Sequence, residues 1–249
     1  MQNAGKDILF ESKKEVLLKL KKEIVLQRFS SPKNNRLASA SLYPFASAFP
    51  FNQFPLGCIH EFVCPTNESL SSSSAFVCGI LTSLKQNKSP IIWISSSQKT
   101  YPPSLLSFGI APHNIIFINI EKPNDILYAS EEALRCSGLA AVITDIRELN
   151  FKQSRRLQLA TEQSRVTGFV LRNKPKTVNT TACVSRWMIT PAISASYQNI
   201  PGIGFPSWHV DLQKVRNGKP QSWHIEWQAG HFVYEHDLPT SIIHHKKAV

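Results

Sequence analysis

Short apolar runs alternate with helical segments from residue 57 to residue 172. The apolar runs are 57–63, 90–95, 114–120, 139–146 and 166–172. The segments in which apolar residues have helical spacing are 74–85, 124–138 and 152–164. Short runs without polar alternation are typical of strands buried on both faces, and the intervening helices indicate βαβ units. The pattern therefore predicts an α/β fold with a mostly parallel β-sheet flanked by helices.

After residue 181 the pattern becomes that of a β-rich segment. The stretch "ACVSRWMIT" predicts one more strand, and 208–227 alternates around "NGKP", which is a strong signal for a β-hairpin. Trp223, Ile225 and Trp227 fall on one face of this hairpin. These aromatics and Trp208 lie among basic residues, a combination that can stack on nucleobases, but the shared face favours a role in the core.

The first 56 residues form a different region. Leu17, Leu20 and Ile24 are spaced for one face of an amphipathic helix at 8–29, with lysines between them. The following stretch is rich in Ser, Pro, Asn and aromatics without a sustained period, which predicts a linker that packs against something. The expected division is an N-terminal helix (1–30), a linker (31–56), an α/β domain with the C-terminal hairpin (57–230) and a tail (231–249).

Charge favours an anionic partner. The chain of 249 residues has a formal net charge of +11 and is 42% hydrophobic, so it can bury a core while remaining strongly basic. The basic excess is local, because 146–190 carries nine Lys or Arg against two Asp or Glu, whereas 61–145 carries five against seven. Nucleic acid is the partner class that this distribution indicates.

Several functional classes lack their signatures. No run approaches the roughly 18 to 20 apolar residues of a membrane helix, so we expect a soluble, cytoplasmic protein without a membrane partner. The five cysteines are scattered without metal-ligand spacing, which favours reduced core residues and no metal site. The serine hydrolase motif Gly-x-Ser-x-Gly does not occur.

The stretch 64–72, "CPTNESLSS", lies where many α/β proteins hold phosphate. The order of elements over 57–146 resembles the ATPase core of RecA-like recombinases, in which a Walker A loop, Gly-x-x-x-x-Gly-Lys-Ser/Thr, follows the first strand. Aligned in this way, Cys64 stands at the first glycine, Ser69 at the second and Leu70 at the lysine, while Ser71 keeps the hydroxyl on the magnesium side. The loop therefore has the length of a Walker A motif without its chemistry.

Other catalytic parts are also missing. Glu68 adds a negative charge where phosphate would lie. The glutamate that activates water after "IIWI" in such ATPases is replaced by "SSSQ" at 95–98. Asp145, which ends "AAVITD", matches the Walker B aspartate, but one acidic residue after a buried strand is common and favours a structural role. We expect no nucleotide cofactor and no catalytic residues.

A closer resemblance is carried by seven blocks in a fixed order. The blocks are "YPPSLLSFGI", "EEALRC", "LAAVITDI", "SRRLQLATEQSRVTGFVLR", "SRWMI", "PGIGFPSWHVDL" and "GKPQSWHIEW". Together they resemble the ImuA family, RecA-like proteins of bacterial damage-inducible mutagenesis cassettes. The resemblance implies a RecA-like core and a noncatalytic adaptor of translesion synthesis. The implied partners are an ImuB-type Y-family polymerase relative, an error-prone replicative-type DNA polymerase and RecA.

The resemblance also points to a surface for DNA. In RecA-like proteins the loops after the Walker B strand and after the next strand face DNA. The residues at these positions are Arg147, Lys152, Arg155, Arg156, Lys174 and Lys176. Such cations can contact backbone phosphates without regard to sequence. The alternative is a solvated basic helix face, or pairing of Arg155 and Arg156 with carboxylates such as Glu148.

Two other functions compete with the adaptor. A divergent ATPase would bind nucleotide through backbone groups alone, against which Leu70 and the missing glutamate argue. A SulA-like cell-division inhibitor would share the degenerate core, but this chain is longer than that family, and the tryptophan hairpin with "SRRLQLA" fits ImuA better.

Deletion of residues 1–30 tests whether the N-terminal helix docks on a partner. An apolar stripe of Leu17, Leu20 and Ile24 left in water would cost about 1.5 to 3 kcal/mol per side chain relative to burial, so it must pack somewhere. If the helix docks on a partner subunit, the truncated protein should lose pull-down of that partner at an unchanged melting temperature. A large fall in melting temperature with the partner still captured would instead place the helix on its own core.

Overall fold

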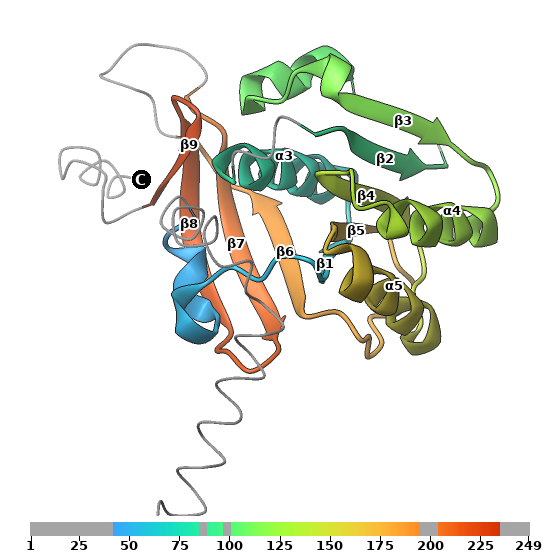
Figure 1. Cartoon of the computed structure of the whole chain (residues 1–249). Helices are drawn as coiled ribbons and strands as arrows, with labels where there is room; N and C mark the ends of the chain where they lie inside the picture. The colour runs from blue at the N-terminus through green and yellow to red at the C-terminus, as the bar shows by residue number, and fades with distance from the viewer. Residues whose placement is uncertain (1–41, 85–88, 97–100, 195–203, 235–249) are drawn as a thin grey trace, which may run out of the picture. The chain divides into compact units, whose positions relative to one another are not determined.

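The structure is a computed structural model that describes residues 42–84, 89–96, 101–194 and 204–234 (Figure 1). The chain divides into two compact units, Met1–Asn35 and Arg36–Val249, and every described residue belongs to the second. The helix expected at 8–29 and the tail from residue 235 onward lie outside the described residues. The N-terminal docking hypothesis therefore stays a prediction.

The described residues form one nine-stranded sheet in the order β3-β2-β4-β5-β1-β6-β7-β8-β9. The strands are β1 Ile59–Cys64, β2 Ile91–Ser95, β3 Ile115–Asn119, β4 Ala141–Ile146, β5 Thr167–Asn173, β6 Ser185–Pro191, β7 Ser207–Val215, β8 Gln221–Gln228 and β9 His231–Tyr234. Pairing is parallel from β3 through to β6 and antiparallel from β6 to β9. The predicted α/β fold with a mostly parallel β-sheet flanked by helices is confirmed.

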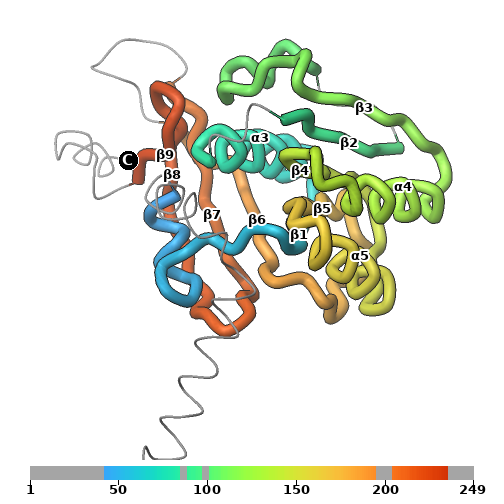
Figure 2. Tube along the Cα trace, in the orientation of Figure 1, coloured from blue at the N-terminus to red at the C-terminus, as the bar shows by residue number. Residues whose placement is uncertain are grey.

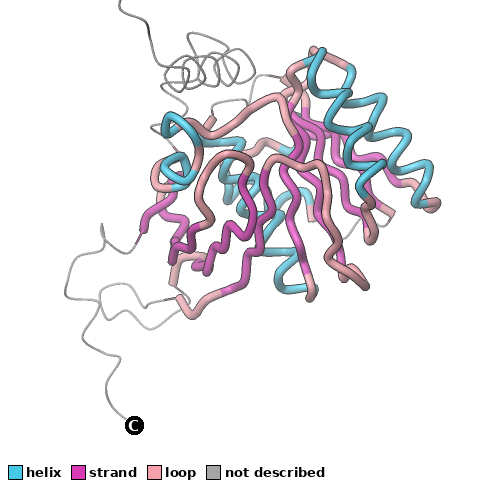
Figure 3. The backbone as a smooth tube through the Cα atoms, turned by 90° about the horizontal axis from the view of Figure 1, so that it is seen from below, coloured by secondary structure: helices cyan, strands magenta, loops and turns pink. Residues whose placement is uncertain are grey.

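Three α-helices cover the two faces of the parallel part, as Figure 3 shows from below. They are α3 Asn67–Ser83, α4 Pro123–Arg135 and α5 Phe151–Ser164, and short 3₁₀ helices are η1 Phe45–Ala48, η2 Pro50–Asn52, η3 Pro102–Phe108 and η4 Pro112–Asn114. α3 packs on one face in the main core, with Phe62 of β1 and Trp187 of β6. α4 and α5 pack against each other and cover the other face, over Ile59 and Val142.

Residues 42–56 belong to the main core, although we expected a linker at 31–56. Phe45 is fully buried and meets Phe76 of α3, Trp223 of β8 and Phe232 of β9 edge-to-face, at centroid distances of 5.1 to 5.3 Å. Figure 2 shows this segment, in blue, beside the red C-terminal strands. The aromatics of 42–56 thus pack against strands that come last in the chain.

The segment is also attached by hydrogen bonds through a buried histidine. His60 of β1 bonds the carbonyl of Pro55 through Nε2 at 2.9 Å and the hydroxyl of Ser185 through Nδ1 at 2.6 Å. Burial lowers the pKa of His60 to about 4, so the imidazole is neutral near pH 7. One neutral ring therefore joins the N-terminal segment, β1 and β6.

The predicted C-terminal hairpin is present as β7 and β8. Trp208 and Trp227 are 4% and 3% exposed, and the indole of Trp227 donates to the carbonyl of Ser107 at 2.9 Å. α3 approaches these strands closely at Gly79, where a Cβ would lie only 2.6 Å from the ring of Phe232. The core role of the tryptophans is confirmed. β9 adds a third antiparallel strand, so residues 231–234 of the expected tail belong to the sheet.

The buried aromatic Phe45 gives a direct test of the packing of 42–56. Phe45→Ala should lower the free energy of unfolding by about 3 to 5 kcal/mol, because the cavity removes contacts with three elements. Phe51→Ala is the matched control from the same segment, since Phe51 is 44% exposed and should lose less than about 1 kcal/mol. Denaturant unfolding measures both. Equal losses would contradict the described packing.

Candidate nucleic-acid interface and degenerate nucleotide site

The junction between β1 and α3 is closed by a helix cap. Only Pro65 and Thr66 separate the strand from the helix, which begins at Asn67. The Thr66 hydroxyl accepts from the Ser69 amide at 3.2 Å, and the Ser69 hydroxyl accepts from the Thr66 amide at 2.9 Å, which is a capping box. The prediction that 64–72 is a loop is therefore wrong from residue 67 onward. The reciprocal cap replaces the glycine-rich turn that would wrap a phosphate.

The side chains at the positions aligned with the Walker A motif are packed or bonded within the protein, or are exposed. Leu70, at the place of the lysine, is 7% exposed and packs in the main core. Cys64 is fully buried, its Sγ donates to Ser73 Oγ at 3.3 Å, and burial raises its pKa to about 12. Ser71 is exposed in the first turns of α3. The positions that matched a Walker A loop thus supply packing and capping.

A negatively charged side chain, that of Glu68, lies in the first turn of α3 next to this junction. Glu68 is exposed, and its pKa is lowered mainly by a hydrogen bond to Thr66, with a smaller contribution from nearby Lys174. Its carboxylate is therefore ionised near pH 7 and also satisfies the positive end of the helix dipole. A bound phosphate would meet this charge directly.

Asp145 lies in β4, at the carboxyl end of the parallel strands. It is 9% exposed and pairs in register with Leu171 of β5. Because β5 lies between β4 and β1, Asp145 is two strands away from the degenerate junction. Ser95, which ends the neighbouring β2, is buried and is followed by Ser96, so serines occupy the described part of the segment where the catalytic glutamate was sought.

A buried ion network lies on the face of β1 opposite α3, and the sequence analysis missed it. Glu61 of β1 is fully buried and accepts from Arg172 Nη1 of β5 at 2.9 Å, Arg186 Nε of β6 at 3.0 Å and the Thr181 hydroxyl at 2.7 Å. Arg172 is also fully buried, and its Nε has no partner in the described residues. The available signal was one Glu and one Arg, each inside a mostly apolar strand.

The network holds the connection between β5 and β6 against the sheet. Arg172 Nη2 donates to the Thr177 carbonyl at 2.8 Å and lies 3.4 Å from Glu148 Oε2. Further along the connection, the Ala182 amide donates to the Ser154 hydroxyl of α5 at 2.9 Å. We call residues 174–184 the β5–β6 loop. It is fixed between the sheet and α5.

Three of the predicted DNA-contacting cations come together at the start of this loop. Arg147 follows β4, is exposed and donates from Nε to the Lys174 carbonyl at 3.1 Å. Lys174 and Lys176 are exposed as well, and the Lys176 amide donates to Glu148 Oε1 at 2.8 Å. The two loops that were expected to face DNA therefore touch. Their cations lie beyond the carboxyl ends of β4 and β5.

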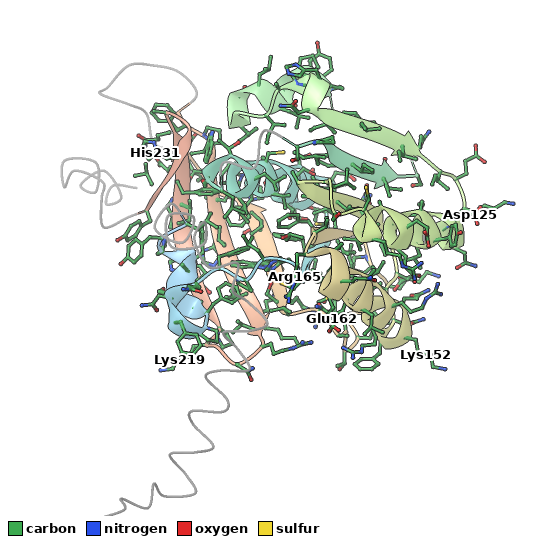
Figure 4. All side chains as sticks on the ribbon, viewed as in Figure 1. Asp125, Lys152, Glu162, Arg165, Lys219 and His231 are labelled. Atoms are coloured by element: carbon green, nitrogen blue, oxygen red, sulfur yellow. The ribbon has the colours of Figure 1, made fainter. Side chains whose placement is uncertain are left out.

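The other three predicted cations lie on α5. Lys152 is exposed near its start (Figure 4). Arg155 lies 3.8 Å from Glu162 on the same helix, and Arg156 lies 2.5 Å from Glu131 on α4. Pairing of the two arginines with carboxylates was one of the alternatives, although the partner named there, Glu148, pairs with Arg172. DNA contact through this helix stays a prediction.

Comparison with known proteins identifies the family. The chain is 30% identical over 213 residues to Protein ImuA of Caulobacter vibrioides, in strain NA1000 / CB15N and in strain ATCC 19089 / CIP 103742 / CB 15. Each match covers 80% of this chain and 87% of the relative. The chain belongs to the ImuA family. The predicted resemblance is confirmed.

Other comparisons add less about this ImuA-family protein. No family model matches the chain. Among solved structures, a KaiC-like protein, PH0186, from the hyperthermophilic archaeon Pyrococcus horikoshii OT3 is similar with a TM-score of 0.48 and 12% identity, over 76% of this chain and 96% of that one.

In the described ranges, no group of three or more His, Cys, Asp or Glu is placed to hold a metal ion. None of the helices described has the length and hydrophobicity to cross a membrane.

Replacement of Glu61 tests the buried network of this ImuA-family protein. Glu61→Gln should lower the free energy of unfolding by about 3 to 5 kcal/mol, because it leaves the buried charge of Arg172 without its main counter-ion. Glu132→Gln is the control, since Glu132 pairs with Arg135 on the surface and should change stability by less than about 1 kcal/mol. Urea unfolding measures both, and equal effects would show that the buried charges are not coupled.

Proposed function

We propose that this ImuA-family protein is a noncatalytic, RecA-like adaptor in damage-induced, error-prone DNA synthesis. The family supports the setting, and one structural observation carries the noncatalytic role: the Thr66–Ser69 cap closes the junction at which a phosphate would bind. In this role the protein brings together an ImuB-type polymerase relative, an error-prone polymerase and RecA. It does so through binding surfaces and consumes no nucleotide.

The proposal is supported by the replacement, in this chain, of groups that ATP hydrolysis requires. Phosphoryl transfer needs backbone amides and a lysine around the phosphates, together with a group that positions the attacking water. In this chain Thr66 caps the Ser69 amide in the first turn of α3, and Leu70 is buried in the core. Ser95 ends the strand that would present the glutamate, and Ser96 follows it. Each requirement fails at a different residue, so no single substitution would restore turnover.

DNA contact is the second part of the proposed role. Arg147, Lys174 and Lys176 are exposed together, with Lys152 on the neighbouring helix. Within the part of the chain that the structure describes, none of them has a carboxylate at ion-pair distance, although Glu68 lies near Lys174. Exposed cations of this kind contact backbone phosphates and give affinity that depends on salt and not on sequence. The adaptor would thereby be held on the damaged template.

The noncatalytic role is tested by ATP turnover and by mutagenesis in cells. Purified protein should release no phosphate from ATP above background, because Leu70, at the position of the Walker lysine, supplies no charge to phosphate. In a strain that lacks the gene, Ser71→Ala should restore the damage-induced mutation frequency as fully as the wild type. Ser71 is the right position because it is exposed and carries the hydroxyl that would serve magnesium.

Two outcomes would contradict the proposal. One is measurable hydrolysis that is lost on Asp145→Ala, with the fold of the variant checked by its melting temperature. The other is a wild-type gene that leaves the damage-induced mutation frequency unchanged when it is restored to the deletion strain. The first would support the divergent ATPase, and the second would remove the role in mutagenesis.

A further inference from the structure

Two positively charged residues on neighbouring strands, β6 and β7, lie opposite each other on the face of the sheet that α3 does not cover. In the antiparallel register of β6 and β7, Arg186 stands directly opposite Lys214. Like charges in such a pair are destabilising. Arg216, one residue beyond the end of β7, adds a third cation. We call these three residues the β6–β7 cluster.

A β-bulge places Lys214 on this side. The register shifts between Arg186 and Trp187, because Trp187 pairs with Leu212 and Arg186 with Lys214, so that β7 contains one extra residue. In a regular strand Lys214 would share the face of Leu212, which is buried in the main core. The bulge turns the lysine outward, in the manner by which bulges re-aim single side chains.

The charge of the cluster is not balanced by protein carboxylates. Glu61 pairs with Arg186, but it also serves the buried Arg172. Within the described ranges Lys214 and Arg216 pair with no carboxylate. They donate to carbonyls of the β5–β6 loop instead, Lys214 Nζ to Thr181 at 2.7 Å and Arg216 Nη2 to Ala182 at 2.6 Å.

Half-burial makes this imbalance costly. Arg186, Lys214 and Arg216 are each partly shielded from water, and the pKa of Lys214 is lowered first by burial and then by Arg186. Carbonyl dipoles compensate a partly desolvated cation less well than a carboxylate does. A bound anion would supply the missing counter-charge, and repulsion between Arg186 and Lys214 would become attraction to a common ligand.

We propose that the β6–β7 cluster is a second phosphate-binding site for nucleic acid, and that one strand reaches from it along the β5–β6 loop to Lys174 and Lys176. Nucleic acid fits better than an acidic protein segment because most of the neighbouring exposed residues are polar, namely Asn179, Thr180 and Gln213, while Val178 is apolar. Polar side chains beside cations suit phosphate contacts, whereas protein interfaces need buried apolar anchors.

The length of the loop suits a polymer that bridges two sites. Asn173 at its start is level with Cys64 of β1, and Ser185 after its end is level with His60. The two ends are therefore four residues apart along β1, which is about 13 Å at 3.3 Å per residue. One phosphate cannot span this distance, so we expect a single strand to engage the two groups of cations through different phosphates.

The inference rests on the proposed DNA contact and adds a site that this contact does not require. The test variant is Lys214→Gln with Arg216→Gln, in which the amides can still donate to Thr181 and Ala182 while both charges are lost. The probe is a dT oligonucleotide of about 20 nucleotides, longer than one binding site. Anisotropy titrations of the full chain between about 0.05 and 0.2 M salt give affinity and salt slope.

We expect the double variant to bind about tenfold more weakly at 0.1 M salt and to flatten the log–log salt slope by about 1.4, which is two single-strand phosphate contacts. Its melting temperature should stay the same or rise, because the substitution removes one charge of a like-charged pair. Lys174→Gln with Lys176→Gln should flatten the slope similarly. Lys122→Gln, at the exposed N-cap of α4, is the control for loss of a single surface charge and should change neither quantity.

Each contrary outcome has a distinct meaning. A lower melting temperature with unchanged DNA affinity would show that the cluster only clamps the loop, while the DNA contact of Lys174 and Lys176 could still be seen in their own variant. Absence of salt-dependent DNA binding by the wild type would overturn the proposed DNA contact together with this inference. Polyglutamate that binds more tightly than dT, and is weakened by Lys214→Gln with Arg216→Gln, would overturn the choice of nucleic acid.

Discussion

The rest of the structure depends on the pairing of the buried carboxylate of Glu61 with Arg172 and Arg186. A charge without water is costly unless it is paired, and Glu61 is paired through β5, β6 and the loop between them. A slip of one residue in β1 would turn Glu61 toward Phe76 and Trp187 in the aromatic core. The network therefore sets the register of β1 against β5 and β6, and β6 is the strand at which the parallel part of the sheet meets the antiparallel part.

Much of the fold could be predicted from hydrophobic period, and the failures have physical causes. The strands β1 to β5 were found because each is a short apolar run, and β7 and β8 because polar and apolar residues alternate around "NGKP". β9 was missed because its four residues were assigned to the tail. The start of α3 was missed because Thr66 and Ser69 were interpreted as loop residues, although a hydroxyl three residues after Thr66 completes a cap. Residues 42–56 have no period because Phe45 and Phe49 contact the core individually, with no regular face.

The candidate site was predictable only where neighbours in sequence are neighbours in space. Lys174 and Lys176 could be found because they lie in one loop after a predicted strand. Arg186 and Lys214 are 28 positions apart, and they meet because of strand pairing and a bulge that no local pattern announces. Under our proposals, binding would depend on charges that the fold brings together at some cost to its own stability.

The position of Phe45 has a consequence for how the chain is made. Its aromatic partners Trp223 and Phe232 are synthesised 178 and 187 residues later, so the main core cannot close until the last strands leave the ribosome. Contacts of such long sequence separation slow folding, and the early aromatic segment stays exposed in the meantime. Truncation of the C-terminal strands would consequently leave an apolar segment nearly 200 residues upstream without its packing partners. The order of the elements along the chain thus exposes a binding surface for chaperones during translation.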